Sequence, residues 1–135
     1  MKELTVPATT DSIQTVTDFV NEELEKLGCS VRIQSQIDIA IDELFGNIAR
    51  YAYRPGIGPA TIRVDVEDEP LEVVLTFIDQ GKPFDPLAAE DPDITLPAEM
   101  RRIGGLGVYL VKKTMDAIRY EYCNGQNILR IRKRL

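Results

Sequence analysis

The chain of 135 residues is the size of one compact domain, and its apolar fraction of 44% is ordinary for a globular core. A net charge of −6 argues against a nucleic-acid binder held by phosphate contacts and against an anionic membrane surface. The absence of histidine argues against histidine bases, phosphohistidine relays and histidine-ligated zinc. Residues 1–10 hold no apolar signal segment and no long apolar run occurs, so we expect a cytoplasmic protein.

The first part of the chain is predicted to form a short strand, over residues 3–7, and two helices. Residues 10–12 supply capping oxygens before the first helix, and Gly28 lies where that helix should end. The second helix is expected from about residue 32 to residue 53, and a Pro- and Gly-rich breaker follows at residues 54–59. Apolar residues recur at helical spacing through both segments: Ile13, Val16, Phe19, Val20, Leu24, Ile33, Ile37, Ile41, Leu44 and Ile48.

Two strands, residues 60–67 and 71–78, are predicted after the breaker. The second contains a nearly continuous apolar run, which is typical of a central strand. Residues 79–102 carry four prolines and scattered acids, and therefore indicate a long loop. Long loops in compact domains are more often functional than idle.

A third helix is expected to begin near Gly105. Its apolar residues would be Val108, Leu110, Val111, Met115 and Ile118. Strands at residues 120–123 and 127–131, joined at Asn124-Gly125, read as a hairpin. This element order predicts an α+β fold, a two-layer sandwich in which a mixed, mostly antiparallel sheet carries helices on one face.

A polar stripe at the edge of the second helix is the first candidate for chemistry. At about 100° per residue, Glu43, Asn47 and Arg50 lie within roughly 60° of one another, beside the apolar arc. A solvated stripe with a weak ion pair would explain them equally well. Gly46, however, costs about 1 kcal/mol relative to alanine inside a helix, which suggests a close approach of a backbone or a ligand.

Glycines mark two further candidates. Asp79 and Gly81 directly follow the buried strand, where a carboxylate could accept a hydrogen bond from an adenine amino group; a plain turn is the alternative. Gly104, Gly105 and Gly107 precede or open the third helix, where bare N–H groups favour an anion; a hinge is the alternative. The spacing fits neither a Rossmann fingerprint nor a P-loop.

Taken together, the order of these motifs resembles the GHKL, or Bergerat-fold, nucleotide-binding set. Glu-x-x-x-Asn on a helix corresponds to the N box, Asp-x-Gly-x-Pro-Phe after a strand to the G1 box, and Gly-x-Gly opening a helix to the G2 box. The form DQGKPFDP together with GGLGVYLVKKTMD most resembles the anti-sigma factor serine/threonine kinases of the histidine-kinase-like ATPase family. The resemblance spans residues 37–116 in its motifs and implies a single ATPase domain over residues 1–135.

The resemblance implies ATP and Mg²⁺ as cofactors. Asn47 would hold Mg²⁺ through its side-chain oxygen, Glu43 would be the general base, and Arg50 would sit near the phosphates. Asp79 would contact the adenine amino group, and Gly81 would give the base room. The remaining nucleotide contacts would be backbone N–H groups of Gly105, Leu106 and Gly107.

The resemblance also implies an ATP lid over about residues 85–104, in which Arg101 and Arg102 either aid phosphoryl transfer or decorate the surface. The N box departs from many relatives, which carry His or Lys where this chain has Arg50-Tyr51. Catalysis is therefore less firmly implied than nucleotide binding.

The leading functional hypothesis is an anti-sigma factor that binds ATP or ADP and phosphorylates a Ser or Thr of a STAS-type anti-sigma antagonist. Its implied partners are a sigma factor and that antagonist, with a homodimer left open and no direct nucleic-acid or membrane partner. The alternatives are a non-catalytic nucleotide-sensing module and a stand-alone ATPase with water as acceptor. Glu43 favours the kinase, because a pure binder needs no base there.

Overall fold

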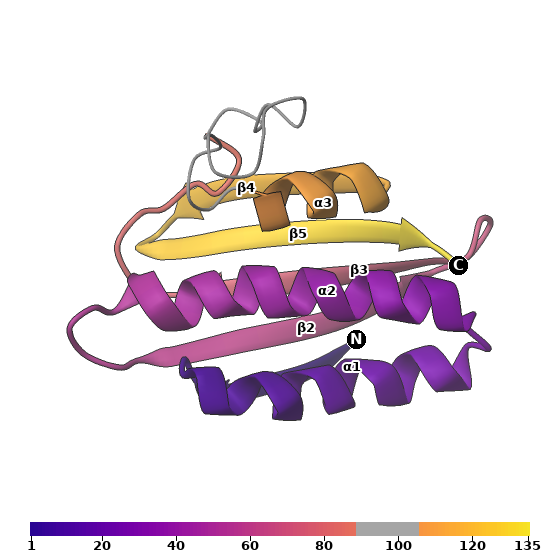
Figure 1. Ribbon diagram of the computed structural model, residues 1–135, viewed down its shortest axis with the longest axis horizontal. Helices are drawn as coiled ribbons and strands as arrows, with labels where there is room; N and C mark the ends of the chain where they lie inside the picture. The colour runs from indigo at the N-terminus through magenta and orange to yellow at the C-terminus, as the bar shows by residue number, and fades with distance from the viewer. Residues whose placement is uncertain (89–105) are drawn as a thin grey trace.

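The computed structural model describes residues 1–88 and 106–135 (Figure 1). The elements follow in the order β1 (Lys2–Pro7), η1 (Thr10–Ser12), α1 (Ile13–Lys26), α2 (Val31–Asn47), η2 (Ile48–Ala52), β2 (Pro59–Glu67), β3 (Glu72–Asp79), α3 (Leu106–Thr114), β4 (Ala117–Cys123) and β5 (Gln126–Arg134). The strands form one sheet in the order β1-β2-β3-β5-β4, and helices cover one of its faces (Figure 1).

The predicted α+β class is therefore confirmed, with one difference in the sheet. Every pairing among the described strands is antiparallel, so the parallel component expected of a mixed sheet does not occur among them. Hairpin connections between β2 and β3 and between β4 and β5 account for two of these pairings, as the short turns in the sequence predict.

The core lies between the sheet and the helices, where the apolar side chains of the two layers pack against each other. Alternate residues of the strands point to the helices, and the buried residues of α1 and α2 recur at helical spacing. The fully buried side chains with the largest volumes are Phe45, Phe77, Leu24, Ile37, Ile41, Leu44, Ile62, Leu75 and Ile131. Because α2 contributes four of these nine, more than any other element, its position on the sheet is fixed by packing.

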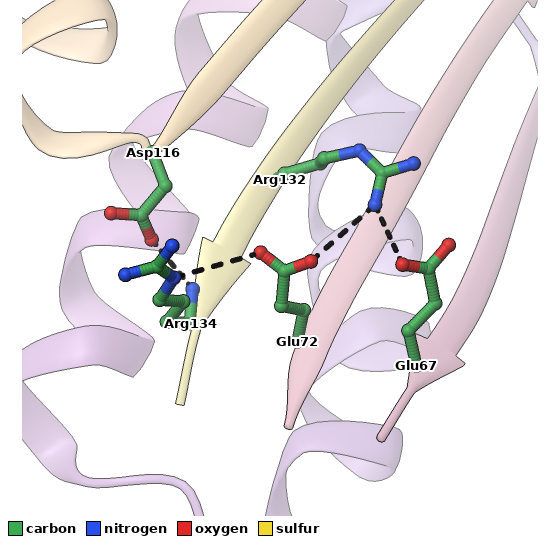
Figure 2. Close-up of polar contacts among 5 residues, drawn as sticks. All are labelled: Glu67, Glu72, Asp116, Arg132 and Arg134. Atoms are coloured by element: carbon green, nitrogen blue, oxygen red, sulfur yellow. Dashed lines mark hydrogen bonds and ion pairs between the residues drawn. The ribbon is translucent and has the colours of Figure 1, made fainter. Parts of the chain in front are cut away.

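The face of the sheet away from the helices is covered by charged side chains. Val74 and Thr76 of β3 point to this face and are only 5% and 4% exposed. Arg132, the β5 partner of Val74, reaches Glu67 at 2.7 Å and Glu72 at 3.4 Å (Figure 2). The long arginine stem and its ion pairs thus shield the outer face of the central strand.

The second helix is interrupted where the sequence predicts that it continues. The regular α-helix ends at Asn47, and residues 48–52 form a wider, π-helical turn. Contacts from distant residues hold this turn: Lys82 N donates to the Ala52 carbonyl at 2.9 Å, and Gln80 N donates to the Tyr53 hydroxyl at 2.8 Å. Tertiary hydrogen bonds therefore override the local helical pattern at this end of α2.

The third helix is shorter than the apolar pattern predicts. It ends at Thr114, whose carbonyl accepts a hydrogen bond from the Lys133 ammonium at 2.6 Å, a favourable partner for a helix C-terminus. Ile118 belongs to β4 instead, and Leu110 is 43% exposed, so neither is the helical core residue that was expected.

The final hairpin is confirmed and extends further than predicted in both strands. Asn124 and Gly125 connect β4 to β5 with φ values of +53° and +76°. Two positive φ angles in a two-residue loop match the right-handed twist of the flanking strands, and Asn-Gly is the sequence best suited to them.

Candidate nucleotide-binding site

The three predicted motif clusters meet at one end of the sandwich. The last turns of α2, the end of β3, the start of β5 and the start of α3 gather there, on the left in Figure 1. A pocket with mainly apolar walls opens there, formed by residues of α2, η2, β3, the segment after β3, β4 and β5. It is lined by Leu44, Asn47, Ile48, Ala52, Phe77, Asp79, Lys82, Phe84, Pro86, Tyr120, Asn127 and Leu129.

Asp79 supplies a buried carboxylate on the floor of this pocket. It is the last residue of β3 and is 4% exposed. Its Oδ1 accepts hydrogen bonds from Gly81 N at 2.8 Å and from Asn127 Nδ2 at 2.9 Å. Burial raises the pKa of Asp79 above its ordinary value, while the two donors act to lower it.

Asn127 is a site residue that the sequence reasoning missed. It lies opposite Asp79 in the antiparallel register of β3 and β5. Its Nδ2 also donates to the Lys82 carbonyl at 2.8 Å, and its Oδ1 accepts from Phe84 N at 3.0 Å and from the Tyr120 hydroxyl at 2.5 Å. The available signal was an amide two residues before Leu129 and four before Ile131, in the alternation that faces the core.

Gly81 follows Asp79 closely, and the structure gives a packing reason for a glycine at this position. A Cβ at this position would overlap the carbonyl group of Ala52 in the π-helical turn. The adjacent residue, Lys82, donates its N–H to that same carbonyl. Gly81 therefore permits the backbone after β3 to pack directly on the end of α2.

The polar stripe of the second helix is present as predicted. Asn47 Nδ2 donates to Glu43 Oε1 at 3.5 Å, and Arg50 Nη2 donates to Asn47 Oδ1 at 3.2 Å. Among the described residues, the close neighbour of Gly46 is a side chain: a Cβ there would lie 3.0 Å from Arg50 Nη1. The glycine thus lets the guanidinium fold back along the helix toward Asn47.

The start of α3 brings the third cluster to the first. A Cβ at Gly107 would overlap the carboxylate of Glu43, so that carboxylate lies directly against the first turn of α3. Leu106 begins the helix. Gly105, Arg101, Arg102 and most of the predicted lid lie outside the described residues.

Two exposed aromatic rings border the pocket. Tyr51, in the π-helical turn, and Phe84, after β3, have ring centroids 6.1 Å apart with an interplanar angle of 37°. The Arg50 guanidinium carbon lies 5.9 Å from the centre of the Tyr51 ring. The rim therefore combines aromatic surface with a cation, next to the apolar pocket walls.

The pocket residues fit a purine nucleotide. Apolar walls with one buried carboxylate suit a flat base that carries an amino group, and the α3 N-terminus suits phosphate. The described residues contain no group of three acidic, cysteine or histidine side chains able to hold a metal alone. The Asn47 side-chain oxygen suits Mg²⁺, which usually takes few protein ligands and completes its shell with phosphate and water.

None of the helices in the described part of the chain is long and apolar enough to cross a membrane.

Both cysteines are free thiols. Cys29 is partly buried, whereas Cys123, at the end of β4, is exposed.

Comparison with known proteins agrees with this geometry. The model of the histidine kinase-like ATPase domain matches residues 6–133. Serine/threonine-protein kinase BtrW of Bordetella bronchiseptica is 31% identical over 100 residues, which cover 74% of this chain and 70% of BtrW. Serine-protein kinase RsbW of Bacillus cereus is 27% identical, over 94% of this chain and 81% of the relative. Serine-protein kinase RsbW of Halalkalibacterium halodurans is 28% identical, over 91% of this chain and 76% of the relative. The chain belongs to the histidine kinase-like ATPase domain family, in which these protein serine/threonine kinases are its relatives.

Proposed function

We propose that this chain is an ATP-dependent protein serine/threonine kinase whose general base is Glu43. The observation that carries the proposal is the position of the Glu43 carboxylate. It lies against the first turn of α3 and beside Asn47, which lines the same pocket as Asp79. A carboxylate at that point is well placed for proton transfer to or from a group that reacts with the terminal phosphate.

At the base end, Asp79 would recognise the adenine amino group. Both donors found among the described residues go to Asp79 Oδ1, which leaves Oδ2 as the acceptor for a ligand. The apolar walls at Leu44, Ile48 and Phe77 would enclose the ring. Burial strengthens such a hydrogen bond, because water does not compete for the carboxylate.

At the phosphate end, the backbone N–H groups of Leu106 and Gly107 would donate to phosphate oxygens, and we assign Gly105 the same role. Mg²⁺ bound through Asn47 Oδ1 would neutralise the phosphates. Arg50 now donates to that oxygen, so it would have to turn toward the phosphates to make room. Its side chain is exposed and long enough for this movement.

In the proposed reaction, a serine or threonine hydroxyl oxygen attacks the γ-phosphorus of ATP. The new oxygen–phosphorus bond forms as the bond to the ADP oxygen breaks, and the hydroxyl proton passes to the Glu43 carboxylate. Catalysis then depends mainly on positioning, which the contact between Glu43 and Gly107 provides across two elements.

We extend the proposal to the biological partners. The RsbW and BtrW relatives are named protein kinases, which supports a protein acceptor. The motif resemblance adds that the acceptor is a STAS-type anti-sigma antagonist and that the chain also binds a sigma factor, as a homodimer and in the cytoplasm.

The decisive experiment separates binding from transfer. Calorimetry with Mg-ATP should show binding that Asp79→Asn weakens, whereas Glu43→Ala should abolish phosphate transfer to the acceptor and leave affinity unchanged. Asp42→Ala is the matched control, because Asp42 is the adjacent acid but is exposed. Full transfer by Glu43→Ala would show that the base is assigned wrongly.

The same measurements distinguish the alternative functions. ATP binding without phosphorylation of any protein would identify a nucleotide-sensing module. Phosphate release to water, at a rate that a protein acceptor does not change, would identify a stand-alone ATPase. No binding of either adenine nucleotide would refute the site itself.

A further inference from the structure

We propose that Asn127 is a positioning residue that sets the base selectivity of the pocket, by holding Asp79 as an oriented hydrogen-bond acceptor that favours a 6-aminopurine over a 6-oxopurine. The inference rests on the proposed function, since it concerns how the same pocket recognises its nucleotide. It assigns a role to a residue outside the three motif clusters.

The first step is the orientation of the carboxylate. Asn127 Nδ2 and Gly81 N both donate to Asp79 Oδ1, at 2.9 Å and 2.8 Å, from opposite parts of the chain. Two donors on one oxygen fix the rotation of the carboxylate about its last bond. The other oxygen is then presented in a constant direction to whatever enters the pocket.

The second step is the orientation of the amide itself. Asn127 Oδ1 accepts from Phe84 N and from the Tyr120 hydroxyl, while Nδ2 donates to the Lys82 carbonyl as well as to Asp79. A flipped amide would place its oxygen against the Lys82 carbonyl and the Asp79 carboxylate, and its NH₂ against the Phe84 N–H. Only one orientation satisfies the network, and that orientation offers a donor to Asp79.

The third step is the protonation state. Asp79 and Asn127 are 4% and 6% exposed, and burial raises the pKa of the Asp79 carboxyl. The Asn127 donor opposes that rise because it stabilises the ionised form. An ionised carboxylate can only accept, so it matches a 6-amino group and repels a 6-oxo group. A protonated carboxyl could donate to a 6-oxo group and would lose this discrimination.

The test compares ATP with inosine triphosphate, which carries a 6-oxo group in place of the 6-amino group. Calorimetry would give the Kd of both nucleotides for the wild-type protein and for Asn127→Leu, which keeps the branched side-chain skeleton but removes both amide functions. We expect the wild type to prefer ATP by about tenfold or more, the usual effect of one hydrogen bond to a charged group. In Asn127→Leu this preference should fall by about tenfold.

The ratio of the two Kd values is the appropriate readout because partial unfolding cancels in it. A reduced folded fraction weakens both apparent affinities by the same factor. A purely structural role for Asn127 would therefore lower both affinities and leave their ratio unchanged, which would overturn the inference. Asn127→Ala provides a second variant, with the same expected loss of preference, should the leucine variant fail to fold.

Tyr122→Phe is the matched control. It removes a hydroxyl from the same strand, β4, at a side chain that is 47% exposed and does not line the pocket. The preference for ATP should remain within about twofold of the wild type, well below one hydrogen bond's effect. A wild-type protein that binds neither nucleotide would refute the proposed function. A wild-type preference for ATP that Asn127→Leu retains would refute only the role of Asn127.

Discussion

Adding one methyl group at Gly107 should separate catalysis from nucleotide binding. A Cβ at this position would overlap both carboxylate oxygens of Glu43, which are the far end of a flexible side chain. Alanine keeps the backbone N–H at residue 107, so the first turn of α3 retains its donor. We therefore expect the carboxylate to move while α3 stays in place.

The size of the effect follows from the overlap. The added Cβ would lie closest to Glu43 Oε2, so the carboxylate must move by more than about 1 Å to restore an ordinary contact distance. A misplacement of about 1 Å can cost roughly 100-fold in rate, which is within the range that a general base contributes. Stability should not fall, because alanine is favoured over glycine in a helix by roughly 0.5–1 kcal/mol.

The assay is phosphate transfer to the acceptor protein at saturating ATP, with calorimetry and thermal unfolding on the same samples. Gly107→Ala should lower kcat by about 100-fold with ATP affinity and Tm preserved. Gly46→Ala is a matched control, since its methyl would meet the flexible end of Arg50 instead of the base. Wild-type kcat in Gly107→Ala, at wild-type affinity, would refute the assignment of Glu43.

Three further changes test other parts of the site and fold. Gly81→Ala would press a methyl group against the Ala52 backbone carbonyl, which cannot rotate away. Urea denaturation should therefore show that the free energy of unfolding falls by about 1–3 kcal/mol, and ATP binding should weaken. An unchanged urea midpoint would contradict this packing. Burial raises the pKa of Asp79 in the folded protein above its value in the unfolded chain. The folded protein is therefore most stable when this carboxyl is neutral, and it loses that stability as the pH rises from the unfolded-state pKa through the folded-state pKa. Asp79→Asn should therefore raise Tm at neutral pH, and this gain in Tm should shrink as the pH is lowered toward the ordinary carboxyl pKa of about 3.9. A lower Tm of Asp79→Asn at neutral pH would contradict the raised pKa of Asp79. Gly125→Ala should cost about 1 kcal/mol because φ is +76° there, whereas Asn124→Gly should be tolerated; equal stabilities in thermal unfolding would contradict the turn assignment.

Features that depend on neighbouring residues could be predicted from the sequence. The Asn124-Gly125 turn was found because positive φ angles suit those two residues, and β3 was found from its continuous apolar run. The stripe of Glu43, Asn47 and Arg50 followed from the helical period alone. For the turn and the stripe, the interaction that fixes the structure lies within a few residues of the pattern that predicts it, and for β3 the apolar run itself indicates burial on both faces.

Features that depend on distant residues could not be predicted. The π-helical turn is held by Lys82 N on the Ala52 carbonyl, 30 residues away along the chain by residue number. Asn127 acquires its importance only from the register that places it opposite Asp79. The packing of Gly81 on the Ala52 backbone was also not predictable, because local sequence does not show which segment packs on a turn.

The double-sided burial of β3 has a consequence for how the pocket opens. Residues 73–79 are buried without interruption, and β3 is the central strand of the sheet. Backbone amides of such a strand exchange with solvent only through global unfolding, so we expect the slowest hydrogen–deuterium exchange there. The carboxylate of Asp79 is thus attached to the segment least able to open locally. Nucleotide binding and release should therefore leave the Asp79 end of the pocket unchanged. Any rearrangement during a reaction cycle should be confined to the side of the pocket formed by the helices.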